Sequence, residues 1–141
     1  MFDFIFEDIE ADNVTHEYLS EFEELHNIIF PNILREYYTK YNRAKIKQIC
    51  FEHMGMEFEI EFIIPLKYAN INIEKIMSFN ANNKYIPASY IPLAEDVDGD
   101  DYYWDARTGK VYYLSLENVE HPIPIADSVE SFFELLNRSV I

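Results

Sequence analysis

The chain has 141 residues, of which 49% are hydrophobic, three are glycine and six are proline. This composition excludes disordered, collagen-like and low-complexity proteins. No apolar run approaches the roughly 18 residues of a membrane helix, and acids stand near the N-terminus where a secretory signal carries Lys or Arg. We therefore expect a cytoplasmic protein with no membrane segment, and the lone Cys50 agrees with a reducing compartment.

The charge is strongly negative, with 26 acids against 11 bases and a formal net charge of −15. Such a chain repels phosphate backbones, so we expect no direct nucleic-acid binding and a partner with a basic surface. Mutual repulsion between copies favours a monomer. No linker or repeat interrupts the sequence, so residues 1–141 are expected to form a single domain, with 1–12 as a strand or arm.

Helical spacing appears in three places. From about Thr15 it predicts an amphipathic helix, and Pro31 is favourable in the first turn of a second helix that runs to about Asn42. The inner face of the first helix would carry Tyr18, Phe22, Leu25 and Ile29, and its outer face Glu17, Glu21, Glu23 and Glu24. Asp127 and Glu130 form a capping box that predicts a closing helix.

The middle of the chain alternates with a period of two. Residues 56–62 place Phe58, Ile60 and Phe62 on one side of a predicted strand and three glutamates on the other. Further strands are expected at 47–52, 101–105 and 110–116, the last two joined by a hairpin at Gly109. Residues 73–79 fit a strand or a short helix. The predicted class is α+β, with N-terminal helices, a central antiparallel sheet and a C-terminal helix.

Two acidic segments are the candidate partner-binding surface. One is the glutamate stripe of 57–61, which is also what the wet face of an ordinary strand looks like. The other is 96–105, which mixes acids with Tyr102, Tyr103 and Trp104; alternation alone leaves open which ring faces outward. The predicted contact residues are Glu57, Glu59, Glu61, Asp96, Asp98, Asp100, Asp101, Tyr103 and Asp105.

Two chemical alternatives compete with binding. Cys50 and His53 would need spatial contact and an orienting third group to act as a nucleophilic pair. Residues 96–100 resemble a calcium loop, but with Gly99 at the sixth position the first is Ala94 and the twelfth is Asp105. The template requires Asp and Glu at these two positions, so we expect no metal. We also expect no cofactor and no catalytic residues.

Two blocks of sequence carry a family resemblance. The first is Glu21 to Leu25, then Phe30-Pro31 and the segment 37–42. The second runs through 91–94, 98–100, 102–105 and 108–112 to the Ala-Asp-Ser step at 126–128. Their order and spacing resemble the SUKH superfamily, which includes the yeast Smi/Knr regulators and many bacterial relatives.

The resemblance implies a compact α+β domain without enzymatic activity. Bacterial members are commonly immunity proteins that bind and neutralise a cognate polymorphic toxin, often a nuclease or deaminase. Yeast members are regulatory scaffolds, so a regulatory adaptor is the alternative. We expect an immunity protein of the bacterial type that occludes its toxin directly.

Overall fold

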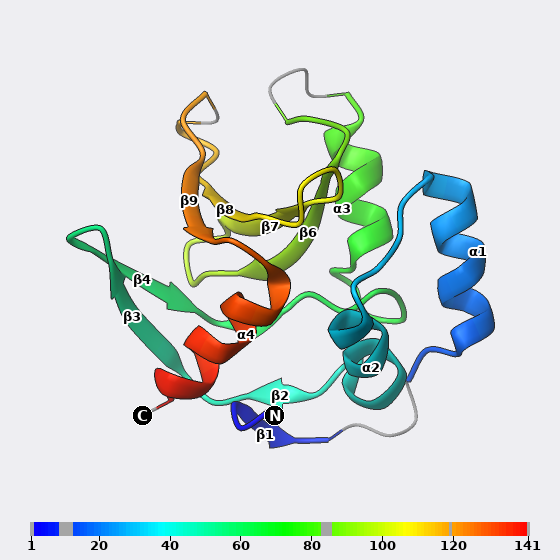
Figure 1. Ribbon diagram of the computed structural model, residues 1–141, viewed down its shortest axis with the longest axis horizontal. Coiled ribbons are helices and arrows are strands. Elements are labelled where there is room, and N and C mark those ends of the chain that lie inside the picture. Colours follow the sequence, from blue (N-terminus) through cyan, green and yellow to red (C-terminus); the bar gives the residue numbers. More distant parts are fainter. Residues whose placement is uncertain (1, 9–12, 83–85, 119, 141) are drawn as a thin grey trace.

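The computed structural model describes residues 2–8, 13–82, 86–118 and 120–140. In chain order the elements are β1 (Ile5–Glu7), α1 (His16–His26), α2 (Asn32–Tyr41), β2 (Lys45–Ile46), β3 (Ile49–His53), β4 (Met56–Ile60), β5 (Phe62–Ile63), α3 (Ile73–Asn80), β6 (Tyr90–Glu95), β7 (Asp101–Asp105), β8 (Val111–Leu114), β9 (Ile123–Ala126) and α4 (Val129–Arg138) (Figure 1). Helices and antiparallel strands are mixed, which confirms the predicted α+β class. None of the helices in these ranges has the length and apolar character of a membrane span.

The main sheet has the order β5-β6-β7-β8-β9, and every neighbouring pair is antiparallel. The predicted hairpin between β7 and β8 is present, with Gly109 at a φ of 81°. Gly99 takes a φ of 87° in the turn between β6 and β7. Such positive φ values suit glycine because it has no Cβ to clash.

The predicted strand over 56–62 is in fact two strands in different sheets. β4 pairs with β3 through a tight turn at Met54 and Gly55, both with positive φ. β5 instead pairs with β6, and the transition occurs at Glu61, whose N–H donates to the Glu95 carbonyl at 2.9 Å. The alternation predicted the buried face correctly but could not show that the chain changes sheets.

The main core lies between one face of the sheet and the helices. Tyr102 and Trp104 point into it from β7 and are almost completely buried. The ring of Phe132, on α4, lies 5.7 Å from that of Tyr102, and Phe30 lies 6.1 Å from Trp104. Burying such large rings supplies much of the stabilisation available to a domain of this size.

The opposite face of the sheet carries a smaller cluster. Tyr103 packs there with Ile86, Tyr90 and Leu114. Asn80, at the end of α3, donates to the Tyr103 hydroxyl at 3.1 Å. The segment 73–79, which the sequence left open, is therefore the helix that borders this face.

The first helix differs from its predicted face assignment. Leu25 and Ile29 are 79% and 82% exposed. α1 ends at His26, and Asn27 follows in the left-handed conformation, so Ile29 lies beyond the helix. Glu23, expected on the outer face, instead accepts hydrogen bonds from the Phe30 N–H at 2.7 Å and the Arg35 guanidinium at 2.6 Å.

The closing helix is confirmed, but its cap is one residue later than predicted. The Ser128 hydroxyl, not the Asp127 carboxylate, accepts the capping hydrogen bond, from the Ser131 N–H at 3.0 Å. Phe132, Phe133 and Leu136 form its buried face.

We predict that Ser128→Ala lowers the free energy of unfolding by about 1 kcal/mol, because one N–H of the first turn loses its acceptor. Asp127→Ala is the matched control and should cost less than half as much. Urea unfolding measures both. Equal costs, or a larger one for Asp127→Ala, would contradict this capping assignment.

Candidate functional site

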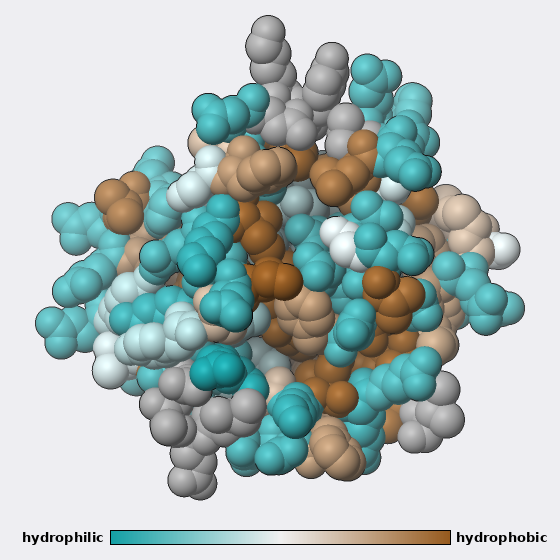
Figure 2. Space-filling view, turned by 180° about the vertical axis from the view of Figure 1, so that it is seen from behind, coloured by the Kyte–Doolittle hydropathy of each residue, from teal (hydrophilic) through white to brown (hydrophobic). Residues whose placement is uncertain are grey.

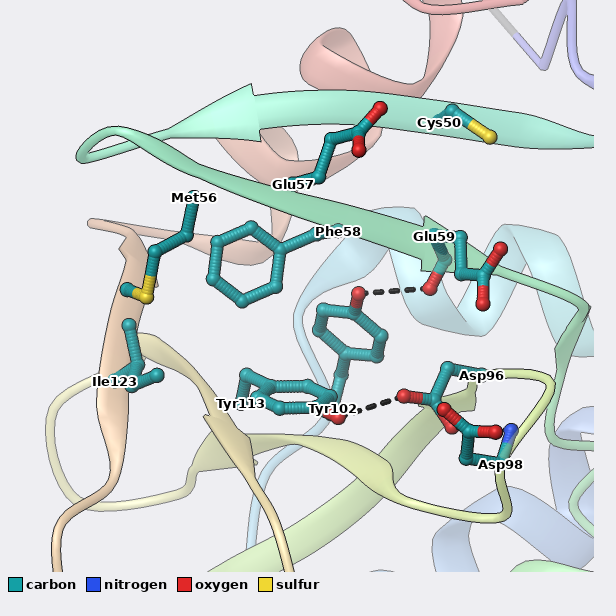
Figure 3. Close-up of a pocket in the computed structure, with 10 residues that line it drawn as sticks. All are labelled: Cys50, Met56, Glu57, Phe58, Glu59, Asp96, Asp98, Tyr102, Tyr113 and Ile123. Atoms are coloured by element: carbon teal, nitrogen blue, oxygen red, sulfur yellow. Dashed lines mark hydrogen bonds between the residues drawn. The ribbon is translucent and has the colours of Figure 1, made fainter.

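A groove of about 420 Å³ lies between β4 and the main sheet (Figure 3). Its volume falls in the range of about 300–1,000 Å³ typical of ligand pockets. The lining residues are Cys50, Met56, Glu57, Phe58, Glu59, Asp96, Asp98, Tyr102, Tyr113 and Ile123. Met56 and Ile123 lie toward one end, and Asp96 and Asp98 toward the other (Figure 3). The groove therefore joins both acidic segments of the sequence.

Aromatic rings form the inner wall of the groove. The Phe58 and Tyr113 rings meet edge to face at 5.4 Å, and the Tyr102 and Tyr113 rings lie 5.0 Å apart. The Tyr102 hydroxyl donates to the Glu59 carbonyl at 2.8 Å, which ties β4 to the sheet (Figure 3). These contacts give the groove a rigid apolar wall.

The Asp96 carboxylate organises the turn at the other end. One oxygen accepts from the N–H groups of Asp98 and Asp100, both at 2.9 Å. The other accepts from the Tyr113 hydroxyl at 2.6 Å. Burial and the hydrogen bond to Asp96 raise the pKa of Tyr113, so its hydroxyl remains a donor. Three hydrogen bonds thus use both oxygens of this carboxylate.

The charged residues that line the groove are all acidic. Glu57 and Asp98 are exposed and Glu59 is half-buried. None of the lining residues is Lys, Arg or His. Side chains two residues apart on one strand face lie about 7 Å apart, within the Debye length at physiological salt, so Glu57 and Glu59 repel each other. A cation bound at the rim would relieve this repulsion.

The family model for the SMI1/KNR4 family (SUKH-1) matches residues 13–135. The chain belongs to the SMI1/KNR4 family. No curated protein sequence matches the chain significantly. Within this SUKH-1 domain, the Tyr-Asn step that ends α2 has a structural task. The Asn42 side chain is completely buried and accepts from the Leu66 N–H at 2.8 Å, so it fixes the segment that follows β5.

Not every predicted contact residue lies at the groove of the SUKH-1 domain. Glu61 is exposed but lines a neighbouring hollow with Gln48 and Val97. Asp100 is half-buried and accepts from the Leu116 N–H at 3.0 Å. Its carboxylate supports the turn and the chain after β8.

Tyr103 and Asp101 lie on the other face of the sheet. Tyr103 is only 2% exposed and packs in the smaller cluster, so its ring is not presented at the surface as predicted. Asp101 lies directly across the strand pair from Glu95, and the Tyr103 hydroxyl lies 3.4 Å from its carboxylate. Burial, together with the hydrogen bond to Glu95, raises the pKa of Asp101 to about 9.

Asp96 and Asp105 are also buried. They are 6% and 3% exposed, so neither offers its carboxylate freely to a partner. The Asp105 side chain accepts from the Arg107 N–H at 3.0 Å and pairs with the Arg107 guanidinium at 3.3 Å. Burial alone would raise the pKa of Asp105, but these bonds to Arg107 lower it. Both carboxylates hold turns in place. The sequence pattern alone cannot distinguish such buried acids from exposed ones.

The resemblance of residues 96–100 to a calcium loop has a structural explanation. The Asp96 carboxylate, which the calcium template would use as a ligand, instead accepts the hydrogen bonds that hold the turn. In the described ranges, no three His, Cys, Asp or Glu side chains are grouped so that they could hold a metal.

Cys50 and His53 do not form the catalytic pair that was considered. They are three residues apart on β3, so their side chains point to opposite faces. Cys50 lines the groove, whereas the His53 ring lies 2.8 Å from the Pro124 carbonyl on β9. Sequence reasoning missed Cys50, Met56, Tyr113 and Ile123 as groove residues, because nothing in the local pattern shows that β4 and the sheet diverge.

A second hollow, of about 610 Å³, lies beside α1 and α3 and is lined by residues such as Leu25, Met77 and Ile86. Figure 2 shows, for one face of the molecule, how apolar side chains reach the surface among hydrophilic ones. This hollow is the larger of the two, but its lining contains no acid. It therefore offers nothing that would attract a basic partner, and we take the acidic groove as the functional site.

We predict that Asp96→Ala lowers the free energy of unfolding by about 2–3 kcal/mol, because three donors lose a charged acceptor. Asp98→Ala should change it by less than about 0.5 kcal/mol, since that side chain is exposed. Chemical denaturation measures both variants. Similar effects in the two would contradict the structural role of Asp96.

The raised pKa of Asp101 makes the stability of the protein depend on pH. Its pKa is raised from 3.8 to about 9 on folding, so the native state binds more protons between these values. The free energy of unfolding therefore falls as pH rises through this interval. Between pH 5 and pH 8 the wild type should lose at least about 1 kcal/mol more than Asp101→Asn, which has no proton to release there. Equal pH profiles for the two proteins would refute the prediction.

Proposed function

We propose that this protein is an immunity protein that binds a cognate bacterial toxin through its acidic groove and occludes the toxin's basic surface. The carrying observation is the groove itself, where Glu57, Glu59 and Asp98 surround an aromatic wall and no base is present. Membership of the SUKH-1 family and the net charge of −15 support the proposal. We place the protein in the cytoplasm of the producing cell, as a monomeric single domain.

The physical basis of neutralisation is charge complementarity combined with apolar contact. Toxins that act on nucleic acids need basic clefts to hold phosphates, and an acidic protein is attracted to the same surface. Opposite charges raise the association rate, while burial of the partly exposed Tyr113 and the exposed Met56 slows dissociation. The protein needs no chemistry of its own for this, and we propose that it is not an enzyme.

The contact surface we propose is smaller than the acidic sequence suggests. It comprises the exposed rim and the groove wall, and it omits the buried Asp96, Asp105 and Tyr103. Glu61, in the bend between β4 and β5, lines a hollow together with Glu59 and extends the negative surface. Asp100 adds to the negative field but is held by an internal contact, whereas the raised pKa of Asp101 leaves that side chain protonated near neutral pH, so it adds no charge.

The direct test uses the toxin encoded beside the gene for this protein. Wild-type protein should bind it with a Kd in the nanomolar range or below and rescue cells that express it. Charge reversal of Glu57, Glu59 and Asp98 to Lys should weaken binding by about a hundredfold or more and abolish rescue.

The matched control reverses Glu17, Glu21 and Glu24, three exposed acids of α1. It changes the net charge equally but should weaken binding by less than about tenfold, because it acts only through the long-range field. Equal losses in both variants would remove the groove from the contact surface. A phenotype of gene deletion in cells that lack the toxin would favour a regulatory adaptor instead.

A further inference from the structure

One edge of β4 lacks a strand partner beside the groove. β4 pairs with β3 on one side. In an antiparallel pair, residues alternate between hydrogen-bonding toward the partner and away from it. The tight turn at Met54 and Gly55 makes His53 and Met56 a bonded pair, so the backbone groups of Glu57 and Glu59 point away from β3.

Two observed contacts confirm this direction. The Glu59 carbonyl accepts from the Tyr102 hydroxyl, on the side opposite to β3. Two residues further on, the Glu61 N–H donates to the Glu95 carbonyl at the end of β6. The edge of this chain segment is therefore covered by β6 as far as Glu61.

Beyond that point β6 turns away. The Asp96 carboxylate bends the chain into the β6–β7 turn, so no strand in the described part of the chain continues along Glu59 and Glu57. The Tyr102 hydroxyl donates to the Glu59 carbonyl. The N–H of Glu59 and both backbone groups of Glu57 face the groove. An edge of this kind is a template for pairing with another chain.

We propose that the partner inserts an extended, Lys- or Arg-bearing segment that adds to β4 as a strand. The inference rests on the proposed function, since the toxin would supply this segment. Main-chain bonds to Glu57 and Glu59 give the segment its register, as in other complexes formed by strand addition. Alternate side chains reach the acidic rim and the aromatic wall, so basic and apolar residues should alternate along it.

The negative charge beside the β4 edge favours a basic peptide segment as the strand that pairs with it. Edge strands are commonly protected from unwanted pairing by charged side chains, and Glu57 and Glu59 would exclude neutral or acidic strands in this way. A Lys or Arg on the incoming strand converts that repulsion into pairing. A second copy of this acidic chain is disfavoured by the same charges.

The test selects nine-residue peptides from a random displayed library on the full-length protein. Enriched peptides should alternate Lys or Arg with apolar residues, and in the complex the amide hydrogens of Glu57 and Glu59 should exchange more slowly. Absence of enrichment, or enriched peptides without this alternation, would overturn the inference.

Two variants separate backbone pairing from charge. Glu57→Thr removes the carboxylate but keeps the backbone N–H, and it should weaken binding of the best selected peptide severalfold. Glu57→Pro also removes the outward N–H and should weaken it by about a further tenfold. Because a proline could disturb folding, the same peptide with N-methylated amides is tested on the unchanged protein. Undiminished binding of that peptide would overturn strand addition.

The outcome can be separated from that of the proposed function. A toxin that is neutralised equally well by Glu57→Pro would refute strand addition while leaving immunity intact. Selection of alternating basic peptides by a protein that fails to neutralise the neighbouring toxin would refute the immunity assignment alone.

Discussion

The carboxylate of Asp96 determines the shape of the functional surface. By accepting from two turn N–H groups and from the Tyr113 hydroxyl, it bends the chain out of β6 and anchors the turn on β8. β4 is then left without a strand on the side opposite to β3, and a groove opens between β4 and the main sheet. The acidic rim, the aromatic wall and the free strand edge all depend on this one bend (Figure 3).

The net charge of −15 therefore divides into two kinds of acid. Some, such as Asp96 and Asp105, are buried and hold turns through hydrogen bonds. Others, such as Glu57 and Asp98, are exposed and have no such task in the fold. Only the second kind is available to a partner. A protein can thus maintain a large negative charge at one surface while the remaining acids stabilise the turns that shape it.

Much of the fold was predictable because periodicity reports local burial. The strands β7 and β8, the hairpin at Gly109 and the closing helix were all predicted from the sequence. The α1 face was predicted less well, because Glu23 finds one partner in the loop after α1 and another on α2, which no local pattern reveals. The break at Glu61 also escaped prediction, since a strand that changes sheets keeps the same alternation.

The candidate site was predictable only in part, for the same reason. Charge identified both acidic segments, and the structure brings Glu57, Glu59 and Asp98 to one groove. The charge pattern of the sequence could not distinguish these three acids from Asp105, which pairs with Arg107, or from Asp101, which lies against Glu95. The groove wall at Tyr113 and Ile123 depends on long-range packing, which the local sequence does not encode.

The central claim is that negative charge at this groove drives recognition of a basic partner. The most direct measurement is the rate constant of association, as a function of ionic strength, with the toxin that the proposed function requires to be encoded beside this gene. We predict a fall of about a hundredfold or more between low salt and 0.5 M salt, because screening shortens the range of attraction. A rate constant that stays the same across that range would contradict the claim.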